Sequence, residues 1–380
     1  MNDAVIVAAV RAPVGKRNGA LSSVHPADLS AHVLESVVAR VGVDPVEIDD
    51  VIWGCVSQIG EQTFDIARTA VLSAGWPDSV PGTTVDRQCG SSQQAVHFGA
   101  AGVIAGHYDA VVVGGVESMS RVPMGSANAA GNPIGERYIE RFGAAFPNQG
   151  VGAEMIADQW RLSRTQLDEF ALRSHARAAA AVDAGLFESE IAPIVVDGKV
   201  VDADGGIRRG GTLETLAALR PAFREGGSVT AGNASQISDG SAALLVTNSE
   251  TATRWGVKPL ARVHTAVVVG SPPMPMLTGP IPATRKALAK SGLSLDDIGV
   301  FEVNEAFASV PLAWAAEFEV DQAKVNPRGG AIALGHPLGG SGARLMTTML
   351  HHMIDGNIRF GLQTMCEGGG QANATILELL

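Results

Sequence analysis

Residues 89–117 read CGSSQQAVHFGAAGVIAGHYDAVVVGGVE, and a related pattern returns 250 residues later, over residues 339–367, as GGSGARLMTTMLHHMIDGNIRFGLQTMCE. The two stretches share glycines, a serine and a glutamate at this constant offset: Gly90, Ser91, Gly106 and Glu117 correspond to Gly340, Ser341, Gly356 and Glu367. Further upstream, Gly42-Val43 and Ile48 correspond in the same way to Gly292-Leu293 and Ile298. The chain is therefore interpreted as two copies of one folding unit.

Each copy alternates predicted strands with predicted helices. In the first copy, apolar runs predict strands and helical spacing predicts helices over Ala4–Ala9, Pro26–Val41, Val51–Trp53, Cys89–Gly106 and Ala110–Val113. In the second copy the corresponding segments are Leu260–Val269, Ala283–Lys290, Val300–Val303 and Ser341–Ile354. Strands that alternate with helices at this spacing predict an α/β fold with a parallel sheet covered by helices on both faces.

The composition restricts the class of protein. A chain of 380 residues with 46% hydrophobic residues is long enough for two or three domains around a large interior. No apolar run reaches the roughly 18 residues of a membrane span, and Met1-Asn2-Asp3 does not resemble the start of a signal peptide. Three cysteines in unrelated contexts argue against a disulfide framework, and the net charge of −11 argues against nucleic-acid binding. We therefore expect a soluble cytoplasmic protein.

The segment between the two copies has no counterpart in the repeat. It begins with a Gly/Pro/Asn-rich stretch, Pro123–Pro133, and continues with a helix predicted between an N-cap at Ser163 and a stop at Gly185. We expect an N-terminal half over residues 1–120, completed by about 240–256, and a C-terminal half over 257–380. Residues 121–239 are then an inserted loop subdomain that binds the substrate, the alternative being a variable surface excursion.

Three side chains of possible catalytic value are divided between the copies. Cys89 precedes Gly90-Ser91-Ser92 at the predicted start of a helix, where free N–H groups can lower a cysteine pKa to roughly 3.5–7.5. His336 and Cys366 both lie in the second copy, before glycines that let a substrate approach the backbone. Considered alone, Cys89 could equally be a buried apolar residue, and Asn304 could be a helix cap.

In combination these residues resemble the thiolase family over nearly the whole chain. Four motifs carry the resemblance in matching order and spacing: Cys89-Gly90-Ser91-Ser92, Asn304-Glu305-Ala306-Phe307, Gly335-His336-Pro337 and Cys366-Glu367-Gly368. The resemblance implies a duplicated core of five layers, α-β-α-β-α, with an inserted loop subdomain. It also implies an enzyme that uses coenzyme A (CoA) as a substrate, with no tightly bound cofactor and no metal.

The resemblance also implies roles for the motif residues. Cys89 would be the acylated nucleophile, His336 its activating base, and Cys366 the acid/base at the second substrate. Asn304 would hold a water that stabilises the thioester oxyanion together with His336. The backbone N–H groups of Cys89 and Gly368 would form a second oxyanion hole, and such donors are each worth roughly 10²–10³ in rate.

Within the insertion, the segment Ser228–Ser235 resembles the part of a thiolase that lines the pantetheine channel. Ser235 would bond the pantetheine, with Ala231 beside it. Arg208 would lie near the adenine and phosphates of CoA, and Phe223 would line the same groove. Arg208 could instead be a solvated charge. The glycines of 339–342 lack the lysine and spacing of a phosphate loop, so they are interpreted as packing at a helix start.

The resemblance points to the degradative branch of the family. Asn148-Gln149 stand where biosynthetic acetoacetyl-CoA enzymes have a His-Met pair beside the acyl pocket, and Asp86 replaces an asparagine. We therefore expect an acetyl-CoA C-acyltransferase that cleaves 3-ketoacyl-CoA in fatty-acid or steroid side-chain β-oxidation, with Gln149 at the substrate. The alternatives are a biosynthetic acetoacetyl-CoA thiolase, a decarboxylating condensing enzyme, disfavoured by Asn304 and Cys366, and a non-catalytic CoA-binding scaffold. A homodimer or homotetramer is expected, and acyl-CoA and CoA are the expected partners.

Overall fold

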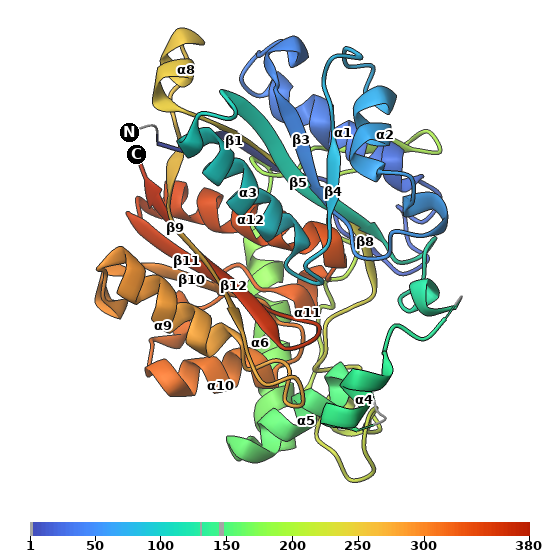
Figure 1. Ribbon diagram of the computed structural model, residues 1–380. Coiled ribbons are helices and arrows are strands. Elements are labelled where there is room, and N and C mark those ends of the chain that lie inside the picture. Colours follow the sequence, from blue (N-terminus) through green and yellow to red (C-terminus); the bar gives the residue numbers. More distant parts are fainter. Residues whose placement is uncertain (1–2, 130, 144–147) are drawn as a thin grey trace.

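The computed structural model describes residues 3–129, 131–143 and 148–380, and it folds into five layers (Figure 1). The middle layer consists of helices α3 (Ser91–Ala105) and α12 (Ser341–Gly356). On one side lie strands β1 (Val5–Arg11), β3 (Asp50–Gly54), β4 (Thr83–Val85), β5 (Ala110–Ser118) and β8 (Ser238–Thr247). On the other lie β9 (Ala261–Gly270), β10 (Val300–Val303), β11 (Phe360–Glu367) and β12 (Gln371–Leu379).

Two pairs of helices form the outer layers. Helices α1 (Pro26–Ala39) and α2 (Ile66–Ser73) bury apolar faces against the first half of the sheet. Helices α9 (Pro280–Ser291) and α10 (Ser309–Phe318) cover the second half in the same way. The predicted five-layer α-β-α-β-α core is thereby confirmed.

The sheet is mixed, so the prediction of a parallel sheet is wrong. Its strand order in the described chain is β10-β11-β12-β9-β1-β8-β5-β3-β4. Strand β3 runs parallel to β4 and β5, and β10 runs parallel to β11, whereas β8 and β12 are antiparallel to both of their neighbours. The turn of residues 368–370 is too short for the crossover that a parallel neighbour requires, so β12 must return antiparallel to β11.

The duplication seen in the sequence is present in the fold. Helix α12 begins 250 residues after α3, and β11 begins 250 residues after β5. Strands β8 and β12 also occupy equivalent places, because β8 lies between β1 and β5 in the first half of the sheet, and β12 lies between β9 and β11 in the second. The inserted segment separates β5 from β8, so this last pair does not obey the constant offset.

The two middle helices pack closely against each other and against both halves of the sheet. Val96 of α3 and Met346 of α12 belong to one buried cluster with Val246 and Leu377 from the two halves. Burial of each such large side chain contributes roughly 1.5–3 kcal/mol. Gly342 allows the close crossing, because a Cβ there would lie 2.7 Å from the Cβ of Gln93. This contact brings the starts of α3 and α12 together.

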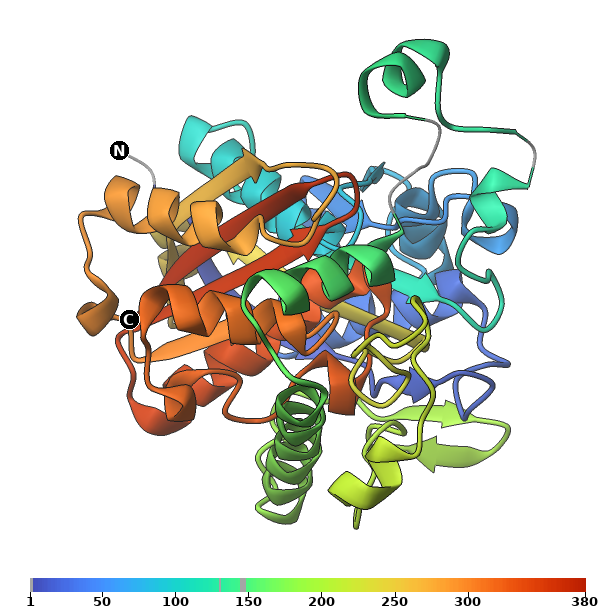
Figure 2. The same ribbon diagram turned by 90° about the horizontal axis from the view of Figure 1, so that it is seen from below.

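The first part of the inserted segment lies at one end of the sandwich (Figure 1). The elements of the whole segment are α4 (Glu136–Phe142), α5 (Gln149–Gln159), α6 (Arg164–Asp183), α7 (Leu213–Ala217) and the hairpin of β6 (Ile194–Val196) and β7 (Lys199–Val201). Viewed from that end, the part that carries α4 projects from the body (Figure 2). Ser163 caps α6 as predicted, through a capping box with Gln166. Buried Arg11 of β1 anchors the segment through Glu190 at 2.6 Å and Asp204 at 2.7 Å.

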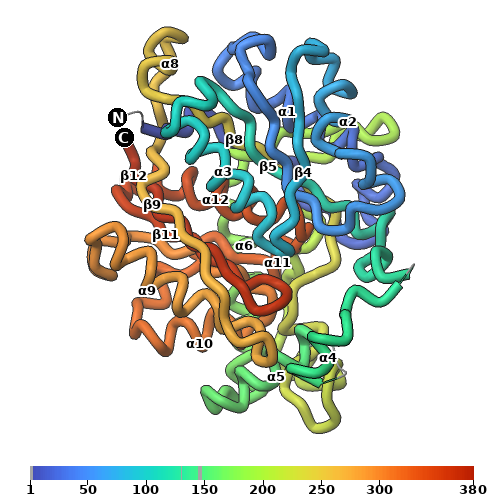
Figure 3. Tube along the Cα trace, viewed as in Figure 1, coloured from blue at the N-terminus to red at the C-terminus, as the bar shows by residue number. Residues whose placement is uncertain are grey.

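Three short elements complete the described chain: β2 (Gly15–Lys16), α8 (Ser249–Arg254) and α11 (Ala331–Leu334). In the chain trace, the C-terminal end lies directly after β12 (Figure 3). Among residues 3–129, 131–143 and 148–380, no helix has both the length and the apolarity to cross a membrane.

Candidate active site

The fold brings four motif residues from both halves to one end of the middle helices. Cys89 immediately precedes Gly90, the N-cap of α3, and Cys366 lies near the end of β11. Asn304 directly follows β10, and His336 lies between α11 and α12. All four side chains are buried. The thiols of Cys89 and Cys366 are close enough for the charge of the first to raise the pKa of the second.

His336 is held in one tautomer by a hydroxyl group. Its Nδ1 lies 2.6 Å from Ser341 Oγ, and that hydroxyl donates its proton to the carbonyl of Pro337 at 2.8 Å. Ser341 can therefore only accept from Nδ1–H, which leaves a lone pair on Nε2. This nitrogen lies 3.4 Å from Asn304 Nδ2. The arrangement presents the base nitrogen of His336 to the site. Ser341 was not predicted as functional, although it is the repeat counterpart of Ser91.

Burial keeps the candidate acid and base neutral. It lowers the pKa of His336 to about 3, with a smaller contribution from the Arg344 charge. Burial, followed by the charge of Glu367, raises the pKa of Cys89 to about 12, and burial also raises that of Cys366. The expectation that the start of α3 stabilises a resting thiolate is therefore wrong, because desolvation outweighs the helix terminus. In the free protein Cys89 and His336 are therefore both neutral.

Asn304 is fastened to the neighbouring strand rather than used as a helix cap. Its backbone N–H donates to Thr364 O of β11 at 3.1 Å, while α10 begins only at Ser309. Within the described residues, its buried Oδ1 has no hydrogen-bond partner. A buried amide oxygen of this kind requires a partner, and a water or a substrate oxygen group is a suitable one. The amide is thus available to the site beside His336.

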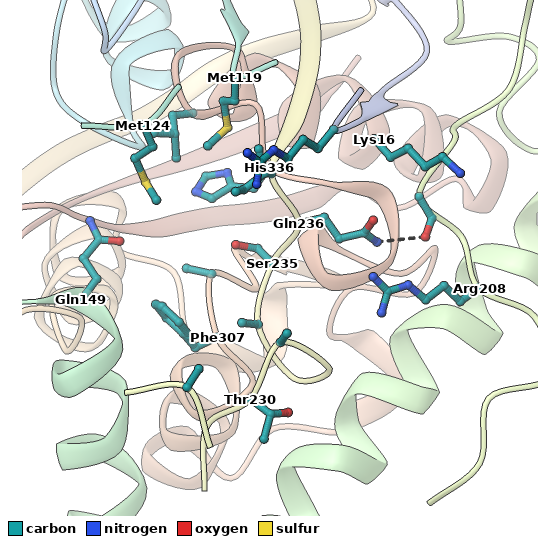
Figure 4. A pocket seen from close by; sticks show the side chains of 18 of the residues that line it. Lys16, Met119, Met124, Gln149, Arg208, Thr230, Ser235, Gln236, Phe307 and His336 are labelled. Atoms are coloured by element: carbon teal, nitrogen blue, oxygen red, sulfur yellow. Dashed lines mark hydrogen bonds between the residues drawn. The ribbon is translucent and has the colours of Figure 1, made fainter. Parts of the chain in front are cut away.

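A cavity of about 690 Å³ opens next to His336 (Figure 4). Its walls include every residue expected to contact CoA or the acyl chain: Gln149, Arg208, Phe223, Ala231 and Ser235. Cys89, Cys366, Asn304 and Gly368 do not line it. Cys366 instead belongs to an apolar cluster with Ala306 and Phe307, which do form part of the wall. His336 and the Ala306-Phe307 pair therefore connect the cavity wall with the other motif residues.

The cavity has one cationic side and one uncharged side. Lys16 and Arg208 lie on one side of it, whereas Met119, Met124 and Gln149 lie on the other (Figure 4). Arg17 also lines the cavity. The neighbouring Arg209 pairs with Asp183 at 2.7 Å, but the Arg208 guanidinium forms no ion pair within the described ranges. Its charge is available to an anionic ligand. Lys16, Arg17 and the two methionines carried no signal in the sequence.

The wall formed by Ser228–Ser235 is rigid. Buried Glu154 of α5 accepts hydrogen bonds from the backbone N–H groups of Ser228 at 2.9 Å and Val229 at 2.8 Å. At the other end of the segment, Ser235 N donates to Ala306 O at 2.9 Å. One end of the loop is thus tied to α5 and the other to the connection between β10 and α10, which holds Ala231 and Ser235 at the cavity.

The start of α5 explains the roles of the Asn148-Gln149 pair. Asn148 Oδ1 accepts from Gly150 N at 2.8 Å and so caps the helix, which leaves Gln149 as the member that lines the cavity. The Phe223 ring packs directly on Gly150, where a Cβ would overlap it, and meets Phe307 edge-on at 5.8 Å between centroids. Two aromatic rings and a glutamine amide therefore shape this side of the cavity.

Comparisons with known proteins agree with this geometry. The family model described as "Thiolase, N-terminal domain" matches residues 4–250, and "Thiolase, C-terminal domain" matches residues 257–379. The chain is 49% identical to a steroid 3-ketoacyl-CoA thiolase of Mycobacterium tuberculosis, covering 100% of this chain and 95% of that protein. It is 47% identical to a 3-ketoacyl-CoA thiolase of Erwinia tasmaniensis, with 100% of both chains covered.

A solved structure extends the likeness to three dimensions. The acetyl-CoA acetyltransferase of Bacillus anthracis superposes with a TM-score of 0.92 at 39% identity, covering 100% of this chain and 99% of that one. The similarity spans both halves and the inserted segment. In the described part of the chain, no group of three or more His, Cys, Asp or Glu side chains is arranged to hold a metal ion.

Proposed function

The chain belongs to the thiolase family, and we propose that it cleaves 3-ketoacyl-CoA with CoA through an acyl-enzyme on Cys89. It is an acetyl-CoA C-acyltransferase of the degradative type, which forms acetyl-CoA and an acyl-CoA shortened by two carbons. Two observations carry the proposal: Cys89 lies close to Cys366, and His336, beside Asn304, lines a cavity with a cationic side.

In the first half-reaction the neutral Cys89 thiol and the neutral His336 imidazole must become a thiolate and an imidazolium. The Cys89 thiol proton passes to His336 Nε2, and the thiolate attacks the 3-keto carbon of the substrate. The bond between C2 and C3 then breaks, which leaves the acyl group on Cys89 and an acetyl-CoA carbanion. Cys366 donates its thiol proton to that carbanion and becomes a thiolate. Its high pKa as an acid suits the protonation of a strongly basic carbanion.

In the second half-reaction a free CoA thiol replaces acetyl-CoA. Cys366 recovers its proton from this thiol, and the CoA thiolate attacks the acyl carbon. Cys89 leaves as a thiolate and takes its proton back from His336. Asn304, through a water, and His336 would stabilise one oxyanion, while the N–H groups of Cys89 and Gly368 would stabilise the other. Every group then returns to its starting state.

We propose that CoA lies with its phosphates at the cationic side of the cavity and its pantetheine along the rigid wall. Arg208, Lys16 and Arg17 supply the positive charge, and Ala231 and Ser235 contact the pantetheine. Phe223 would border the same groove. In this arrangement CoA is a substrate that leaves after each turnover. Residues 121–239 serve as the CoA-binding subdomain. The N-terminal half comprises residues 1–120 and is completed by about 240–256, and the C-terminal half comprises residues 257–380.

Removing the Arg208 charge should weaken CoA binding without affecting the chemistry. For Arg208→Ala we expect KM for CoA to rise about fivefold with kcat nearly unchanged, since a solvent-exposed charged contact contributes about 1 kcal/mol. Arg209→Ala is the matched control, because its guanidinium is already paired with Asp183. Steady-state kinetics with varied CoA measure both. Equal KM values for the two variants would contradict the placement of the phosphates.

The substrate side of the cavity supports a preference for longer acyl groups. Met119, Met124 and Gln149 provide an uncharged surface there, and no histidine borders it at position 148 or 149. We propose that long or branched chains, including steroid side chains, lie against this surface. A biosynthetic acetoacetyl-CoA thiolase is the second candidate, because the superposed acetyl-CoA acetyltransferase shares the fold.

A thiolysis assay across chain lengths separates these two candidates. We expect kcat/KM to rise gradually from acetoacetyl-CoA to longer 3-ketoacyl-CoA esters, because each methylene in an apolar pocket contributes about 1–3 kcal/mol. The assay follows the loss of 3-ketoacyl-CoA absorbance at a fixed CoA concentration. A sharp maximum at acetoacetyl-CoA, with lower values for every longer ester, would favour the biosynthetic function.

We propose a homodimer or homotetramer in the cytoplasm. Strand β4 lies at an edge of the sheet, and its outer backbone groups are available for pairing with a second copy. The segment that carries α4 projects from the body and offers a further contact (Figure 2). Closed symmetric assembly through these surfaces would protect the exposed edge.

A further inference from the structure

A buried carboxyl group lies beside the two thiols and has no role in the proposed reaction. Glu367 is the last residue of β11, immediately after Cys366, and its side chain is fully buried. Within the described chain, neither carboxyl oxygen of Glu367 forms a hydrogen bond of normal distance and angle. The backbone N–H of Asn373 faces the group and favours its charged form. A buried carboxylate with so few donors is costly, so the neutral acid is favoured.

The carboxyl group packs against the start of helix α3. A Cβ on Gly90 would overlap Glu367 Oε1 and lie 2.8 Å from its carboxyl carbon. Asn373 Nδ2 donates to Gly90 O at 3.1 Å and holds the same contact from β12. Gly90 follows the nucleophile directly, so the buried acid lies against the residue next to Cys89, close enough for its charge to raise the pKa of the Cys89 thiol.

The repeat provides a natural contrast. Glu117, the counterpart of Glu367 in the first copy, is equally buried. Its carboxylate accepts four hydrogen bonds, from Val56 N at 3.0 Å, Ser57 N at 3.0 Å, Gln62 Nε2 at 2.8 Å and Gly339 N at 2.9 Å. One copy therefore uses this glutamate to join the segment that follows β3 to the segment that precedes α12, whereas the other leaves it without such partners beside the thiols.

The charges around Glu367 come from three directions. Two charged residues between β4 and α3 act on its pKa: Arg87 lowers it and Asp86 raises it. On β11 itself, the neighbouring titratable group is Cys366. From β5, Glu117 acts on Cys89 rather than directly on Glu367. Burial is the largest influence and raises the pKa of Glu367 to about 8. The acid is thus neutral at neutral pH and ionises within the range where thiolases can be assayed.

We propose that Glu367 controls the nucleophile: as a neutral acid it permits Cys89 to form a thiolate, and as a carboxylate it opposes that step. This role rests on the proposed function of Cys89, and Glu367 acts through Cys89 rather than on the substrate. A buried negative charge nearby disfavours a second one, and the Glu367 charge does raise the pKa of Cys89. The reactivity of Cys89 should therefore gain less from alkaline pH than that of an isolated thiol.

Glu367→Gln tests the role because glutamine imitates the neutral acid at every pH. A group with a pKa of about 8 is about 90% protonated at pH 7 and about 10% at pH 9. We therefore expect equal Cys89 alkylation rates with iodoacetamide at pH 7, and rates about tenfold higher in the variant at pH 9. Trypsin separates Cys89 from Cys55 and Cys366, so mass spectrometry can follow the three thiols individually. Glu250→Gln, at an exposed position of α8, is the control and should match the wild type at both pH values.

The wild type alone also decides the question if Glu367→Gln fails to fold. Its Cys89 alkylation rate should rise tenfold per pH unit below pH 8 and much less steeply from pH 8 to 9.5. A uniform slope across this range, or coincident profiles for wild type and Glu367→Gln, would overturn the role of Glu367. Acylation of wild-type Cys89 by acetyl-CoA at pH 7 tests the proposed function separately. If acylation succeeds while the profiles coincide, only the inference on Glu367 fails.

Discussion

Cys89→Ala is expected to abolish acylation and to lower thiolysis by at least about 10⁴-fold, since no other described group can replace the nucleophile. Alanine keeps the Cβ and removes one sulfur from a nearly fully buried position, so the fold should survive. Circular dichroism checks folding, and stopped-flow thiolysis measures the loss. The effect should be the largest of any single substitution in the chain.

Cys55→Ala is the matched control for this result. Cys55 is also buried, and burial raises its pKa even further, but it belongs to the apolar core between β3 and the outer helices. Its removal should lower stability modestly and leave the acylation rate unchanged. Thiolysis that survives in Cys89→Ala and disappears in Cys55→Ala would contradict the assignment of the nucleophile.

Cys366→Ala is expected to separate the two half-reactions. Cys89 and His336 remain intact in this variant, so acyl transfer from acetyl-CoA to Cys89 should proceed within about tenfold of the wild-type rate. Condensation with a second acetyl-CoA needs a base to remove its proton, and this step should fall by about 10³-fold or more. Single-turnover acylation and steady-state condensation give the two rates. Equal loss of both in a folded variant would show that Cys366 has no separate role.

The repeat made much of the fold predictable. A constant offset located α3, α12, β5 and β11, because strand and helix periodicity are local properties of the sequence. The equivalence of β8 with β12 was invisible, since the inserted segment separates β8 from β5. The antiparallel direction of β12 follows from its short connection to β11, and the equivalent strand β8 is antiparallel to its neighbours as well. The hydrophobic pattern encodes neither direction, which is why the predicted parallel sheet was wrong.

The residues of the candidate site that lie in the four sequence motifs were predictable. Those motifs identified the catalytic candidates, but not Ser341, which orients His336 through a contact across the Pro337 turn. Lys16 reaches the cavity because β2 pairs with β8, more than 200 residues away along the chain, and no local pattern encodes that pairing. The pKa of Cys89 was predicted in the wrong direction, since burial beside Glu367 depends on the assembled site.

The central claim, an acyl-enzyme on Cys89, is tested most directly by trapping the intermediate. Wild-type protein is mixed with a 3-ketoacyl-CoA in the absence of free CoA, quenched in acid and digested with trypsin. The three cysteines then fall in separate peptides, residues 41–68, 88–121 and 360–380. We predict one acyl group, shortened by two carbons relative to the substrate, on peptide 88–121 and its release when CoA is added before the quench. An acyl group found only on peptide 41–68 or 360–380 would contradict the account.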